Sequence, residues 1–77
     1  MTHTPHELAE EFPDKADRIH LLKMSDVHFS RLFEEYHEVN RAVHRAETLV
    51  EPIDDFAEQA LRRRRLALKD EIARLIA

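Results

Sequence analysis

Large apolar residues recur at intervals of seven through the middle of the chain. The repeat and the apolar residues between its members are Phe29, Leu32, Tyr36, Val39, Val43, Ala46 and Val50. Apolar residues at alternating steps of three and four form one continuous stripe along an α-helix. The pattern therefore predicts a long helix that packs against another helix along this stripe.

The composition restricts what such a chain can do. Its 77 residues include no glycine and no cysteine. Glycine-rich phosphate loops are therefore excluded, as are disulfides and thiolate metal sites. The segment Met1 to Glu11 is polar and acidic, and no run of about 18 apolar residues occurs. We expect neither a signal peptide nor a membrane span, and a cytoplasmic location.

The N-terminal part of the chain is expected to be less ordered than the rest. Residues 1–12 contain His3, Thr4 and Pro5 in a row and predict a flexible arm. Pro13 is suited to the first turn of a helix, which predicts a short helix over 13–23.

A second, longer helix is predicted over 26–50. Ser25 followed by Asp26 is a helix-start signal, because a serine oxygen can accept from free backbone N–H groups. Leu22 continues the heptad phase back from Phe29, so the first two helices are either separate or one kinked helix.

Pro52 predicts the end of this helix, and Asp54 can cap a third helix over 55–76. The short connection requires the two long helices to lie antiparallel. The fold class is therefore all-α, with residues 13–77 forming a single helical-hairpin domain. The predicted seam consists of Phe29, Leu32, Tyr36, Val39, Val43, Leu61, Leu68, Ile72 and Leu75.

Several apolar residues lie off this seam and need cover. Phe33, Leu66 and Ile76 are the candidates for an intermolecular surface. Because one hairpin of this size buries little apolar surface, we expect a homo-oligomer or a helical protein partner.

Two segments of the chain resemble a known family. The run from Ser25 to Asn40, continuing through His44 to Glu47, and the later run from Arg65 to Ile72 resemble the YdcH-like family of small bacterial proteins. The resemblance covers about residues 20–76. It implies a coiled-coil-like helical hairpin and assigns no activity, because the family is a domain of unknown function.

Arginine is repeated from Arg62 to Arg65, and arginine binds phosphate well. The candidate anion contacts are Arg62, Arg63, Arg64 and Arg65. Consecutive residues point in different directions around a helix, and the formal net charge is -4. An RNA-binding or RNA-associated protein is therefore the alternative function, behind a non-enzymatic module for protein association.

No residues specify a reaction, a cofactor or a small-molecule substrate. Six histidines are present, but those within the predicted helices lack the spacing of three or four that one metal ion requires. Metal handling through His3 and His6 is a third possibility. We therefore expect no enzyme and no metal site in the helices.

Overall fold

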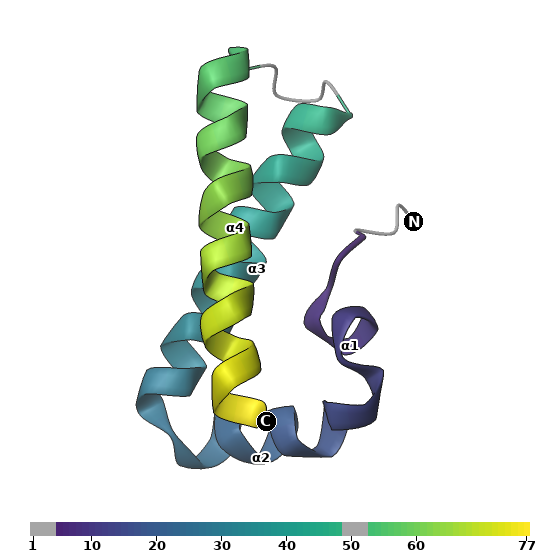
Figure 1. The fold of residues 1–77 in the computed structure, drawn as a ribbon, viewed down its shortest axis with the longest axis vertical. Coiled ribbons are helices and arrows are strands. Elements are labelled where there is room, and N and C mark those ends of the chain that lie inside the picture. The colour runs from purple at the N-terminus through teal and green to yellow at the C-terminus, as the bar shows by residue number, and fades with distance from the viewer. Residues whose placement is uncertain (1–4, 49–52) are drawn as a thin grey trace.

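The computed structural model describes residues 5–48 and 53–77. Its elements are α1 (Leu8–Glu11), the 3-10 helix η1 (Pro13–Lys15), α2 (Ala16–Ser25), α3 (Val27–Glu47) and α4 (Asp55–Ile76). The described residues contain no strand. Figure 1 shows α3 and α4 running antiparallel, with α2 across one end and α1 beside the hairpin. The predicted all-α hairpin preceded by a short helix is confirmed.

The two long helices begin at carboxylate caps. Asp54 caps α4, as predicted, because its side chain accepts a hydrogen bond of 2.7 Å from the Ala57 N–H. At the start of α3 the predicted Ser25 cap is wrong. Asp26 caps the helix by accepting from the Phe29 N–H at 3.1 Å, whereas the Ser25 hydroxyl donates to the Leu21 carbonyl within α2.

The helix bounds agree closely with those expected. The helix predicted over 13–23 is present as η1 followed by α2, and α4 has the predicted range. The end of α3 was placed at residue 50. Val50 and Pro52 lie outside the described residues, within which α3 ends at Glu47.

The core gathers side chains from all four α-helices. Its buried cluster consists of Leu8, Ile19, Phe29, Leu32, Tyr36, Leu68, Ile72 and Ile76. Val43 is buried as well, and Val39 and Leu61 are partly buried. Since Leu8 and Ile19 precede the hairpin, the segment before α3 completes its core.

The last turn of α4 differs from the predicted register. Leu75 was assigned to the seam and Ile76 to an intermolecular surface, but Leu75 is 37% exposed and Ile76 only 2%. Leu68, Ile72 and Ile76 follow one another at steps of four and form one buried stripe, and Ile76 lies in the same core cluster as Ile19 of α2.

Residues 5–12 of the predicted flexible arm contribute side chains to the core. Leu8 is 1% exposed, and Phe12 packs against the core cluster. In the described part of the chain, no helix is long and apolar enough to cross a membrane.

Candidate functional site

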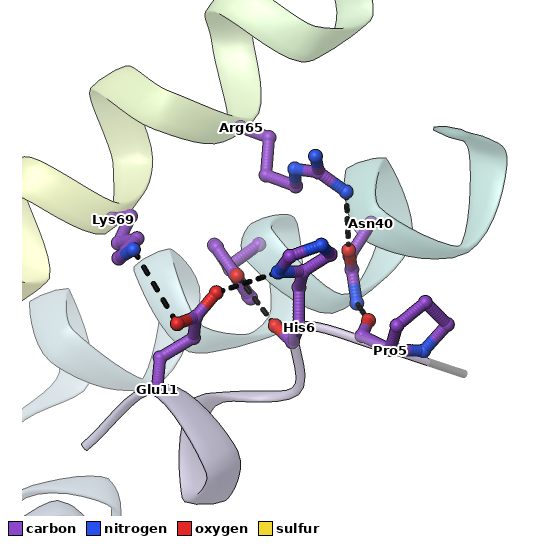
Figure 2. A network of polar contacts seen from close by, with 7 residues as sticks. Pro5, His6, Glu11, Asn40, Arg65 and Lys69 are labelled. Carbon is purple, nitrogen blue, oxygen red and sulfur yellow. Dashed lines mark hydrogen bonds and ion pairs between the residues drawn. The ribbon is translucent and has the colours of Figure 1, made fainter. Parts of the chain in front are cut away.

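The most extensive polar contacts join residues 5–12, which we call the N-terminal segment, to the hairpin formed by α3 and α4. Tyr36 donates its hydroxyl to the His6 carbonyl at 2.6 Å, and the Asn40 amide donates to the Pro5 carbonyl at 2.9 Å. Arg65 in turn donates to the Asn40 side-chain oxygen at 3.0 Å. Figure 2 shows Asn40 between Pro5 and Arg65. The side chain of Asn40 is fully buried, so this pairing satisfies amide groups that would otherwise be costly to bury.

Glu11 adds a second connection. Its carboxylate lies 2.8 Å from His6 Nδ1 and 3.4 Å from Lys69 Nζ (Figure 2). The His6 hydrogen bond, assisted by Lys69, holds the pKa of Glu11 below its ordinary value. His6 also has a φ of 64°, an uncommon conformation for a residue other than glycine. The packed segment therefore holds the backbone of His6 in a defined and unfavourable geometry.

Two titratable side chains of α3 are affected by burial. Burial, together with nearby Glu11, raises the pKa of Tyr36 to about 12, so the hydroxyl remains a donor to His6. His37 Nδ1 lies 2.5 Å from a Glu7 carboxylate oxygen. Burial nevertheless lowers the pKa of His37, because desolvation outweighs the opposing attraction of Glu7.

A shallow cavity lies between the N-terminal segment and α4. Its volume is about 260 Å³, and its lining consists of His6, Glu11, Tyr36, Arg62, Arg65, Leu66 and Lys69. Lys69 pairs with Glu11, and Arg65 bonds the neutral Asn40 amide. The cavity therefore has a cationic wall, part of which is already neutralised by carboxylates of the chain.

The arginine run does not form one patch. Arg62 pairs with Glu47 at 3.0 Å and with Glu58 at 3.1 Å, and Arg64 pairs with Glu35. Arg65 bonds Asn40, and Arg63 is exposed. Three of the four candidate anion contacts are thus engaged within the hairpin, in different directions.

The histidines are also dispersed. Among the described residues no group of three metal-ligating side chains lies together. His28 lies 3.5 Å from Glu71, and His6 and His37 contact carboxylates as given above. His3 lies outside the described residues, so the metal possibility through His3 and His6 stays a prediction.

The candidate interface residues have three different environments. Leu66 is 57% exposed, whereas Ile76 is in the core. Phe33 is partly buried, with the Lys23 ammonium 4.0 Å from its ring centroid and the His37 ring centroid at 4.3 Å. The three residues therefore do not form one exposed surface.

The corner between α2 and α3 carries exposed apolar side chains that the sequence did not assign to an interface. Met24 is 76% and Val27 71% exposed, and Leu21 is exposed beside them. We call these three residues the corner cluster. All three residues lie off the heptad stripe, which is visible in the sequence. Their exposure, however, depends on the bend after Ser25.

Taken together, the described residues form a small helical hairpin whose polar contacts hold its own N-terminal segment. The chain belongs to the family described as "Protein of unknown function (DUF465)", whose pattern matches residues 29–76. This match confirms the resemblance to the YdcH-like family, which is the same family. It covers α4 and nearly all of α3 and leaves the segment before Phe29 outside. No curated protein and no solved structure matches the chain.

Proposed function

We propose that this chain is a non-enzymatic, helix-mediated association module whose partner is a second copy of itself. The supporting observation is the corner cluster of Leu21, Met24 and Val27, three exposed apolar side chains within seven residues. Large contiguous apolar patches on soluble proteins usually mark binding sites, and we infer that these three side chains contribute to one such patch. Burying this surface against the same surface of another copy is the simplest closed arrangement.

The small size of the chain adds to this argument. A domain of this length buries a smaller fraction of its surface than a larger one, so association adds substantially to its stability. Other exposed apolar residues, including Phe56 and Leu66, lie on α4 and not at the corner. They serve as internal comparisons for the proposed surface.

The test is sedimentation equilibrium across a wide range of protein concentrations. The wild-type chain should show a monomer–dimer equilibrium. Met24→Glu should abolish it while helical circular dichroism is retained. Leu66→Glu, a substitution of the same kind at an exposed leucine on α4, should leave it unchanged. A wild-type chain that stays monomeric at millimolar concentration would refute self-association, and sensitivity to Leu66→Glu alone would move the surface to α4.

RNA binding is less well supported than association. Arg62 and Arg64 pair with glutamates of the chain, and Arg65 bonds Asn40. An RNA phosphate would have to displace these partners. RNA binding requires an affinity that falls steeply with salt and drops when the four arginines are changed to glutamine.

A further inference from the structure

The junction between α2 and α3 consists of one residue. Asp26 has φ −132° and ψ 109°, whereas the residues on both sides of it are helical. Its N–H donates to the Leu22 carbonyl at 2.9 Å, and its carbonyl accepts from the Ser30 N–H at 2.9 Å. The hydrogen-bond ladder of α2 therefore continues into Asp26, and that of α3 begins there. A change of backbone angles at this residue is enough to join the two helices.

The sequence on both sides of the junction is compatible with a joined helix. Leu22 lies seven residues before Phe29 and so keeps its heptad phase, and Ile19 lies three before Leu22 on a neighbouring position of the same face; the polar Ser25 and Asp26 separate Leu22 from Phe29. No proline or glycine interrupts residues 16–47. Joining the helices would also give the first free N–H groups of α3 carbonyl partners in α2.

The corner cluster fits the same arrangement. Leu21, Met24 and Val27 follow one another at steps of three, so in a joined helix they lie on one side as surface neighbours. In the bent chain these side chains are exposed around the turn. In a joined helix they form a stripe against which a second joined helix can pack.

A joined helix would carry residues 5–25 away from the hairpin of the same chain. Spanning 32 residues at about 1.5 Å each, it would be about 48 Å long. The hairpin would then lose the burial of Leu8 and Ile19 and the bonds from Tyr36 and Asn40 to the backbone of residues 5–6. A second copy of the chain presents the same segment and can restore every one of these contacts.

We propose that two copies of this chain exchange residues 5–25, with α2 and α3 joined into one helix at Asp26. This inference rests on the proposed self-association and specifies its geometry. Each hairpin then binds residues 5–25 of the other copy. The contacts are the same as those that the bent monomer makes with its own residues 5–25. The bent monomer and the exchanged dimer differ mainly in the backbone at Asp26 and in whether the corner cluster is buried.

A proline at the hinge tests the exchange. Val27→Pro suits the bent chain, because Val27 is the first residue of α3 and the residue before a proline favours the extended conformation that Asp26 already has. In the joined helix the same proline would be internal and cost about 3 kcal/mol, which corresponds to at least about a 100-fold weaker dimer. Val27→Ala is the matched control, since it removes the same apolar side chain without fixing the bend.

A second variant acts in the opposite direction. Asp26→Ala removes the cap that the bent form uses and places a good helix former at the hinge, so it should strengthen the dimer by about 5-fold or more. Sedimentation equilibrium measures all three variants. If Val27→Pro and Val27→Ala weaken the dimer equally, the exchange is refuted while self-association stands. If neither the wild-type chain nor Asp26→Ala dimerises at millimolar concentration, both proposals fail.

A distance measurement reads the hinge directly and needs no change at residues 26 or 27. Spin labels on Asp17→Cys and Arg41→Cys occupy exposed positions of α2 and α3 in a chain with no other cysteine. With the partner copy unlabelled, a joined helix predicts a separation of about 36 Å, longer than in the bent chain. This population should grow with the dimer fraction. A dimer that keeps the short distance would overturn the exchange.

Discussion

Leu8→Ala should destabilise the chain substantially. Leu8 comes from a helix of four residues, yet its side chain is 1% exposed and belongs to the core cluster. The substitution removes three carbon atoms from a buried site, which corresponds to about 2.4 kcal/mol of transfer free energy before any cavity term. Measured core substitutions of this kind cost about 2 to 5 kcal/mol. We expect a loss of about 2.5 kcal/mol in the free energy of unfolding.

Urea unfolding followed by circular dichroism measures this loss. The protein concentration is chosen so that the wild-type chain and the Leu8→Ala variant are both monomeric. Leu66→Ala is the matched control, because it makes the same chemical change at a side chain that is 57% exposed. It should cost less than about 0.5 kcal/mol. If Leu8→Ala costs no more than Leu66→Ala, the N-terminal segment is not part of the folded core, and the contacts described for residues 5–12 do not stabilise the hairpin.

Three further predictions concern the hairpin. Ile76→Ala should cost about 2 to 4 kcal/mol in urea unfolding and Leu75→Ala less than about 1 kcal/mol, since only Ile76 is buried; the reverse order would support the sequence-based register. Asp54→Ala removes the cap of α4 and should cost about 1 kcal/mol, whereas Asp54→Ser, which can still accept from the Ala57 N–H, should retain most of it. The pKa values of His37 and Glu11 are both lowered on folding, so the unfolded chain binds more protons and stability falls as the pH drops below about 6.5 for His37 and below about 4.5 for Glu11. Thermal unfolding between about pH 8 and about pH 4 checks the sign, His37→Gln should remove the first part of the decline, and a melting temperature that rises on acidification to about pH 5.5 would contradict it.

The long helices were predictable because their signals are local. The heptad stripe of α3, the cap at Asp54 and the absence of glycine are readable without knowledge of any contact. The cap at the start of α3 was placed one residue early, since serine and aspartate are both good caps and adjacent in sequence. The choice between them depends on where α2 stops.

The polar contacts at the N-terminal segment could not be predicted in the same way. Asn40 accepts from Arg65 and donates to the backbone of Pro5, and a backbone carbonyl carries no sequence signal. The residues involved are separated by 25 and 35 positions. The pairing of α3 with α4 brings Arg65 to Asn40, and the burial of Leu8 in the core cluster holds the N-terminal residues close enough for Pro5 to join them.

The sequence by itself determined the all-α hairpin, its antiparallel helices and its family, because helix periodicity, capping and a short connection act over a few residues. The tertiary structure decided which side of the last turn of α4 is buried, where each arginine points and how the segment before α3 is held. The arginine contacts depend on the pairing of α4 with α3, whereas the segment before α3 is held by the burial of Leu8 and Ile19 in the shared core. Their positions follow from the bend at Asp26, where one residue between two helices sets the direction of everything that precedes it.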